Sequence, residues 1–172
     1  SVEVIDGKRK ETTAVADTRT FLYAEVLISA IKHNYVFFGR TPARGNDSNF
    51  FGLHQLRELK TGKKERYANE VSILNIFTWT GLIGVMLYFF VFLKASYLAV
   101  VKSNSFFMKL LGLFVAFRWV YAFIEDFSNF NLYYIFLWLM IGMCYSSDFR
   151  MMTDEEIKQW LTGVLGKRIQ IQ

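Results

Sequence analysis

Long uncharged runs dominate the second half of the chain. Residues 71–93 carry no formal charge over 23 consecutive positions, and residues 127–147 form a second uncharged run. A helix of that first length is about 35 Å long, which is enough to cross a hydrocarbon core of about 30 Å. A third apolar stretch between them is interrupted by Lys109 and Arg118. The pattern predicts an all-α, polytopic membrane protein with three transmembrane helices, at about 71–93, 104–124 and 129–147.

The segments on either side of these runs are polar. Residues 1–70 are expected to form an extramembrane region with short helices. The first of these runs from Arg19 to about His33, is capped by Asp17 or Thr18, and is too apolar to lie free in water. Residues 39–47, rich in Gly, Asn and Asp, predict a loop. A second short helix is expected from Ser48 to about residue 59.

Two further helix starts can be located from side chains that cap helices. Asn69 is a suitable N-cap for the first span. Thr153 and Glu156 form a capping-box pattern at the start of an amphipathic helix within the tail, residues 148–172. That tail helix is expected to lie on the membrane surface or to dock against other helices.

Charged residues in the short links predict the orientation of the spans. The link after the first span carries Lys94 and Lys102, whereas the link after the second carries Glu125 and Asp126 and no base. Basic short loops stay on the cytoplasmic side of a membrane. The tail, which carries four basic residues, is therefore expected in the cytoplasm. Residues 1–70 and the Glu125–Asp126 turn are expected together on the outer, periplasmic face.

Composition limits the classes of partner. The 172 residues carry a net charge of +5, with twelve Lys and Arg in residues 1–70 and eight in the rest, so there is no clustered nucleic-acid footprint. The single Cys144 and the widely spaced His33 and His54 have no metal-ligand spacing, and neither a metal nor another cofactor is expected. Three helices enclose little interior, which favours the C-terminal portion of a larger multi-spanning protein.

Arginines are the first candidates for chemistry on the outer face. Arg40 and Arg44 flank a turn in the glycine-bounded loop, and guanidinium groups bind phosphate oxygens in a bidentate manner. They suit a lipid diphosphate headgroup. The alternative is two loop arginines in water or paired with Asp47.

Arg118 is the costliest residue to place in a membrane. It lies two helical turns before Glu125, and an arginine at membrane depth costs at least ~2 kcal/mol unless it is paired, near an end or facing a polar cavity. It points into the bundle toward a lipid diphosphate, beside Glu125 or Asp126; alternatively it snorkels outward or pairs with Glu125 for structural reasons.

Glu70 stands at the start of the first span, with Ser72, Asn75 and Trp79 on one helical stripe. A carboxylate at this position interacts favourably with the helix dipole, which would explain it structurally. It is also placed to act as a general base toward a sugar hydroxyl. The local sequence leaves both roles open.

The order of these residues resembles the O-antigen polymerase and ligase family of bacterial inner-membrane enzymes. Members typically show an Arg-led helix, a Gly-containing loop and a His-Asn-x-x-Leu helix start that runs to Gly-Leu-Ile-Gly. The matching positions are Arg19, Phe38-Gly39-Arg40, Asn46-Asp47-Ser48, Asn69-Glu70 and Gly81-Leu82-Ile83-Gly84. Glu70 stands where the family commonly has its His, and Val71 where it has Asn.

The resemblance implies a multi-pass membrane glycosyltransferase of the bacterial inner membrane. Its substrates would be glycans linked to undecaprenyl diphosphate, with membrane lipid and other polysaccharide assembly proteins as further partners. Glu70 would be the base, and Arg19, Arg40, Arg44 and Arg118 would hold the diphosphate. The departure at Glu70 favours polymerase over ligase, because polymerases vary more there. The alternative from another class is a non-enzymatic flippase-like or scaffold component of polysaccharide export.

Overall fold

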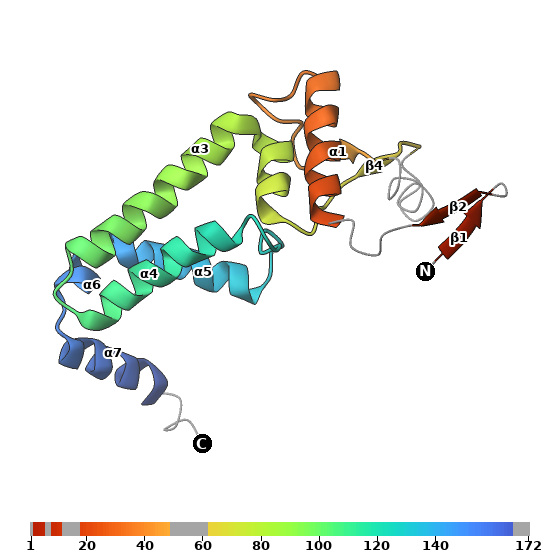
Figure 1. Ribbon diagram of the computed structural model, residues 1–172. Helices are drawn as coiled ribbons and strands as arrows, with labels where there is room; N and C mark the ends of the chain where they lie inside the picture. Colours follow the sequence, from red (N-terminus) through yellow and green to blue (C-terminus); the bar gives the residue numbers. More distant parts are fainter. Residues whose placement is uncertain (1, 6–7, 12–17, 49–61, 167–172) are drawn as a thin grey trace.

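The computed structural model describes residues 2–5, 8–11, 18–48 and 62–166, which are mostly helical (Figure 1). The helices are α1 (Thr18–Lys32), α3 (Ser72–Val101), α4 (Phe106–Tyr121), α5 (Leu132–Tyr145), α6 (Ser147–Met151) and α7 (Asp154–Gly166). Two antiparallel strand pairs join β1 (Val2–Ile5) to β2 (Lys8–Glu11) and β3 (Asn46–Asp47) to β4 (Glu65–Arg66). The predicted helical class is confirmed. The helix predicted after Ser48 lies outside the described residues.

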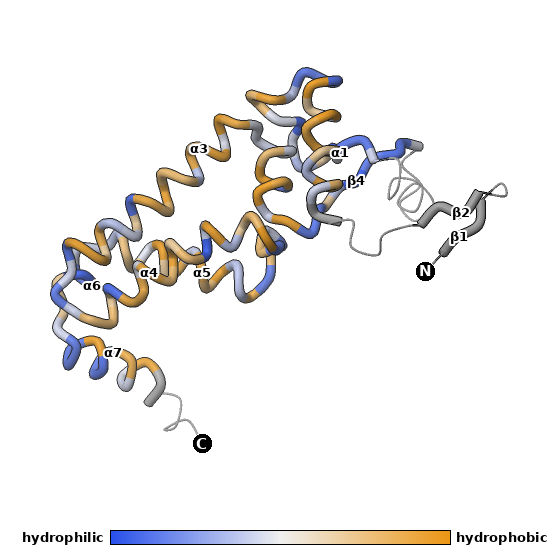
Figure 2. The backbone as a smooth tube through the Cα atoms, viewed as in Figure 1, coloured by the Kyte–Doolittle hydropathy of each residue, from blue (hydrophilic) through white to orange (hydrophobic). Residues whose placement is uncertain are grey.

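α3 is the one helix in these described ranges that has both the length and the apolar composition to cross a bilayer. Figure 2 shows its mainly hydrophobic course. α5 is also apolar but has only 14 residues, and α4 contains Lys109 and Arg118. α3 does not end at residue 93 as the uncharged run predicts. It continues through Lys94, whose ammonium lies 5.8 Å from the centre of the Tyr145 ring.

The first predicted span is not one continuous helix. α3 is broken at Gly81, which has φ 68° and ψ −168°, a backbone conformation that is essentially restricted to glycine. The break divides α3 into a short segment, 72–80, and a long segment, 82–101. Figure 1 shows the short segment folded back beside α1, while the long one runs along α4.

The loop that follows α1 supplies the hydrogen bonds that the break removes from α3. The amides of Arg40 and Thr41 donate to the carbonyls of Thr78 and Trp79, at 2.7 and 3.0 Å. On the other side of the break, the amides of Leu82 and Ile83 donate to the carbonyls of Val36 and Phe37, at 2.8 and 3.2 Å. These bonds satisfy backbone groups that a broken helix in an apolar environment cannot leave unpaired.

Glycines permit this close approach of two backbones. A Cβ atom on Gly81 would lie 2.3 Å from the carbonyl carbon of Phe37, and one on Gly39 would lie 2.4 Å from the amide nitrogen of Thr80. Gly39 also has a positive φ, 71°. The Gly-Leu-Ile-Gly pattern thus begins at a helix break, and its first glycine interlocks with Gly39.

The predicted cap of α3 is wrong. The N-cap position is Val71, whose side chain makes no capping bond. Asn69 instead donates its backbone amide to Oδ1 of Asn75, at 2.6 Å, and Nδ2 of Asn75 donates back to the Asn69 carbonyl, at 2.9 Å. The buried Asn75 therefore holds the entering chain, because its amide both accepts from and donates to the backbone of Asn69.

The long segment of α3 packs against α4 and α5. A methyl group on Gly112 would lie 2.7 Å from Cβ of Ala99, so small residues set the close approach of α3 and α4. The shared core is apolar and fully or almost fully buried, and comprises Phe92, Ala95, Ala99, Val115, Leu137, Ile141 and Cys144.

Hydrogen bonds tie the helices together at both ends of this bundle. At one end the amide of Ile73 donates to the carbonyl of Ala122, at 3.0 Å, so the start of α3 meets the turn after α4. At the other end the amide of Asn104 donates to the carbonyl of Arg150, at 2.9 Å. The turn that carries Glu125 and Asp126 therefore lies beside residues 62–72, and the tail lies beside the α3–α4 link.

The predicted capping box of the tail helix is confirmed. The amide of Thr153 donates to Oε2 of Glu156, at 2.7 Å, and the amide of Glu156 donates to Oγ1 of Thr153, at 3.3 Å. These reciprocal bonds begin α7.

Candidate functional site

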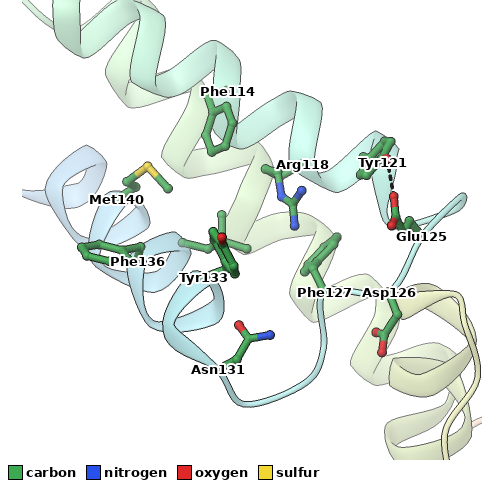
Figure 3. A pocket seen from close by; sticks show the side chains of 11 residues that line it. Phe114, Arg118, Tyr121, Glu125, Asp126, Phe127, Asn131, Tyr133, Phe136 and Met140 are labelled. Atoms are coloured by element: carbon green, nitrogen blue, oxygen red, sulfur yellow. Dashed lines mark hydrogen bonds between the residues drawn. The ribbon is translucent and has the colours of Figure 1, made fainter.

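Arg118 lies in the last turn of α4 and reaches from it toward α5 (Figure 3). Its guanidinium carbon is 4.5 Å from the centre of the Phe127 ring and 5.6 Å from that of Tyr121. Among the described residues it has neither a carboxylate within 4 Å nor a hydrogen-bond partner. The pairing with Glu125 that the sequence left open is not formed, because Glu125 accepts a hydrogen bond from the Tyr121 hydroxyl instead.

A groove of about 390 Å³ surrounds Arg118. Its walls differ in character along its length. One part is apolar and is formed by Phe114, Phe136, Leu137 and Met140; the other is polar or aromatic and is formed by Arg118, Tyr121, Glu125, Asp126, Phe127, Asn131 and Tyr133. Phe114 and Phe136 are themselves exposed, so the apolar part opens to the side of the helices. The groove suits an amphipathic molecule with an anionic headgroup.

Glu70 lines a neighbouring cleft of about 550 Å³. This cleft is formed by Ala68, Asn69, Glu70, Ile124, Glu125, Asp126 and Asn129. Glu125 and Asp126 line both spaces, so the cleft and the groove meet at one turn. The side chain of Glu70 is 75% exposed, and its Oε1 lies 3.2 Å from Nη2 of Arg66. The structure thus brings Glu70 and Arg118 to two sides of the same turn.

Asp126 anchors this turn to α3. Its Oδ1 accepts hydrogen bonds from Oγ of Ser72 at 3.1 Å, from Nδ2 of Asn75 at 3.3 Å, and from the amide and hydroxyl of Ser128 at 2.8 and 2.6 Å. Its Oδ2 accepts from Nδ2 of Asn129 at 2.7 Å. With both oxygens occupied, Asp126 has a positioning role. The sequence signal for it was the pair of polar residues, Ser72 and Asn75, inside an apolar run.

Arg40 and Arg44 lie together, but they surround carboxylates rather than open space. Arg44 makes a bidentate contact with Glu65, with Nε–Oε2 at 3.0 Å and Nη2–Oε1 at 2.6 Å. Arg40, whose side chain is only 10% exposed, donates to the carbonyl of Gly45 at 2.8 Å and lies 3.5 Å from Asp47. It also stacks over the ring of Tyr35. The sequence left open a pairing with Asp47; Arg40 lies near Asp47, but the partner of Arg44 is Glu65.

The predicted set of four arginines therefore does not converge in the part of the chain that the structure describes. Arg118 lines the groove. Arg40 and Arg44 instead contact Glu65 of β4 and so connect the loop before β3 to that strand. Arg19 lies in the first turn of α1, and its side chain is outside the described set. Sequence reasoning could not separate these roles, because Glu65 lies 21 residues from Arg44 in the chain.

The ion pairs around Glu65 make a pH dependence predictable. Burial by itself raises the pKa of Glu65, but the hydrogen bonds and charge of Arg44, with the charge of Arg40, outweigh it, so the pKa lies below the ordinary value of 4.5. A lowered pKa in the folded state adds stability above pH 4.5, and this contribution is lost as the pH falls through the folded-state pKa. Acidification below about pH 4.5 should therefore lower the melting temperature.

The Glu65→Gln variant tests this pH dependence. We expect it to be destabilised at pH 7 by about 1–2 kcal/mol, the lower part of the range for charge-assisted hydrogen bonds, because solvent screens the half-exposed Arg44. Its melting temperature should change less than that of the parent as the pH falls from about 5 through the lowered pKa of Glu65. Glu155→Gln, an exposed acid on α7, is the control and should retain the parent's profile. An unchanged slope in Glu65→Gln would contradict the assignment.

Other groups offer no metal centre within the described residues: no set of three or more His, Cys, Asp or Glu side chains is placed to hold an ion. His33 contacts Asp47, with Nε2 at 2.7 Å from Oδ2, and so belongs to the same polar cluster as Arg40.

Comparisons with known proteins found no match to any family model, to any curated protein or to any solved structure. The resemblance to the O-antigen polymerase and ligase family therefore stays a prediction from the sequence.

Proposed function

We propose that this chain is part of a multi-pass enzyme of the bacterial inner membrane that polymerises glycan repeat units carried on undecaprenyl diphosphate. The long segment of α3, together with α4 and α5 and their flanking residues, crosses the bilayer. Support comes from the side chains around this bundle, which are apolar and outward-facing, and include Leu87, Phe90, Leu110, Leu113, Phe117, Phe136 and Leu139. Residues 62–72 and the Glu125–Asp126 turn lie on the periplasmic side.

The observation that carries the proposal is that Arg118, which has no ion-pair partner in the described part of the chain, lies in a groove that is apolar at one part and polar at the other. An uncompensated cation at such a position is costly, and the cost is recovered when an anion binds. The polyprenyl chain lies along Phe114, Phe136 and Met140. The diphosphate lies at Arg118, whose planar guanidinium can donate two parallel hydrogen bonds to phosphate oxygens.

Transfer then takes place at the turn shared by the groove and the cleft. The acceptor hydroxyl, on a second lipid-linked repeat unit in the cleft, loses its proton to Glu70 and attacks the anomeric carbon of the donor glycan. The bond from that carbon to the diphosphate oxygen breaks, and the electron pair leaves with the polyprenyl diphosphate. Arg118 stabilises the charge of this leaving group. A single displacement inverts the anomeric configuration.

Replacement of Glu70 with glutamine tests the base. We expect Glu70→Gln to reduce polymer formation from purified lipid-linked repeat units by about 10²–10⁴-fold, which is the usual contribution of a general base. Glu125→Gln is the matched control in the same cleft, and it should keep most of the activity. Unchanged activity in Glu70→Gln would refute the role of Glu70, and loss in Glu125→Gln alone would assign the base to Glu125.

The ion pair between Arg66 and Glu70 favours a second candidate function. Because Arg66 gives Glu70 a structural partner, the same face can bind a lipid-linked glycan without chemistry, as a flippase-like or scaffold component of polysaccharide export would. Purified protein that binds the lipid-linked repeat unit but never lengthens it would favour this candidate. Transfer to a different acceptor without chain growth would instead indicate a ligase.

A further inference from the structure

The outward face of α1 is apolar from Phe21 to Ile31, with the exposed polar residues Thr20 and Lys32 near the two ends of the helix. Phe21, Ala24, Leu27, Ile28 and Ile31 lie on one side of the helix and are exposed, with Ile28 66% and Ile31 69% exposed. The opposite side, with Leu22, Val26 and Ala30, is buried against the rest of the protein. The acidic Glu25 turns inward and accepts a hydrogen bond from the Ser48 hydroxyl at 2.8 Å. If the outer side of α1 faced water, polar and charged residues would be expected on that side.

The loop that enters the α3 break extends this apolar surface. Phe37 and Phe38 are 61% and 79% exposed, among the highest values for large apolar side chains in the described part of the chain. Part of the backbone at this tip is paired, because the carbonyls of Val36 and Phe37 accept from α3 and the amide of Gly39 donates to the carbonyl of Tyr35. Side chains here can therefore enter an apolar medium without burying these backbone groups unpaired.

We propose that the outward face of α1 and the tip formed by Phe37 and Phe38 insert into the periplasmic leaflet of the bilayer. This inference rests on the membrane placement of α3 proposed above. The long segment of α3 has 20 residues and a length of about 30 Å, which matches the hydrocarbon thickness. Its first residues, Leu82 and Ile83, then lie at the outer boundary of the hydrocarbon, and their hydrogen bonds hold the tip at that depth.

Lipid is the occupant because the exposed side chains of this surface are mainly large and apolar, while the exposed polar residues of α1, Thr20 and Lys32, lie near its two ends. The exposed residues Leu82, Ile83, Met86, Leu87 and Phe90 carry the surface from the tip along α3. Figure 2 shows hydrophobic residues along α1 and along α3, with hydrophilic ones toward the ends of α1 and near β4. A protein partner would need about one hydrogen bond per 100–200 Å² of interface, and the exposed side chains between Phe21 and Ile31 supply none.

Spin labels report directly on the medium around each side chain. Single cysteines at Ile28, Phe38, Leu87 and Lys63 are placed in a Cys144→Ala background, labelled, and reconstituted in phospholipid nanodiscs. Collision with oxygen, which concentrates in lipid, is compared with collision with a neutral nickel chelate, which stays in water. At positions 28 and 38 we expect oxygen collisions to exceed nickel collisions severalfold, as at position 87. At the exposed Lys63, beside β4, the order should be reversed.

The four positions separate failure of this inference from failure of the proposed membrane placement. Nickel collisions that dominate at 28 and 38, while 87 remains in lipid, would overturn the insertion of α1 and leave the span intact. Immobile labels at 28 and 38 that neither reagent reaches would also overturn it, because protein would then cover the face. Nickel dominance at 87 as well would reject the span itself.

Discussion

Replacement of Gly81 with alanine is expected to prevent the chain from reaching a stable fold. The alanine would occupy a backbone conformation that essentially only glycine adopts, which costs about 1–3 kcal/mol. Its Cβ would also lie 2.3 Å from the backbone of Phe37, so the loop that satisfies the break would have to move away. The amides of Leu82 and Ile83 would then lose their partners. We expect a destabilisation greater than about 3 kcal/mol, because loss of buried hydrogen bonds adds to the strain.

Two other glycines are matched controls for this prediction. Gly62 has a φ of 70°, close to that of Gly81, but no atom lies within 4 Å of its added Cβ. Gly62→Ala should therefore cost only the backbone strain, about 1 kcal/mol. Gly142 lies inside α5 with open space around it, and Gly142→Ala should be neutral or stabilising.

The measurement is the melting temperature of detergent-solubilised protein, taken as the temperature at which half of the monodisperse size-exclusion peak is lost. Gly39→Ala should behave like Gly81→Ala, because its Cβ would meet the backbone of Trp79 and Thr80 at 2.4 Å. If Gly81→Ala melted within a degree or two of Gly62→Ala, the interlocked backbones would not be what holds the break.

The second large effect is expected at Arg118. The Arg118→Gln variant should reduce polymer formation by about 10²–10³-fold, because it removes the charge proposed to stabilise the leaving diphosphate. Arg118→Lys should recover only part of the activity, since a lysine keeps the charge but cannot donate in a bidentate manner. The stability of the folded protein should change little. Arg118 makes no ion pair among the described residues, and loss of its contacts with the Phe127 and Tyr121 rings should lower the melting temperature of either variant only slightly.

Stability and activity together distinguish the arginines. Arg44→Gln should show the opposite profile to Arg118→Gln, with a lowered melting temperature and retained activity, because Arg44 is held by Glu65. Added undecaprenyl diphosphate should raise the melting temperature of the parent and of Arg44→Gln, but not that of Arg118→Gln. Loss of this shift in Arg44→Gln would return Arg44 to the diphosphate site, and a normal shift in Arg118→Gln would remove Arg118 from it.

Much of the fold follows from local sequence. The apolar runs indicated the helices, and Thr153 and Glu156 defined the start of α7. The cost of an arginine within an apolar stretch was enough to single out Arg118. These features depend on hydrophobicity, side-chain capping and charge over a few neighbouring residues. Local sequence therefore determines them.

Contacts between distant segments decided the rest. The conformation of Gly81 depends on a loop about forty residues earlier in the chain, and a glycine within an apolar run does not by itself show that the helix is broken there. The sequence favours Arg40 and Arg44 as a diphosphate clamp, but in the structure the carboxylate of Glu65 lies between them. Glu70 and Arg118 lie on two sides of the Glu125–Asp126 turn only because hydrogen bonds from Ser72 and Asn75 to Asp126 hold this turn against α3. Hydrogen bonds and ion pairs form between whichever groups the chain brings within about 3 Å, and only the tertiary structure determines which groups those are.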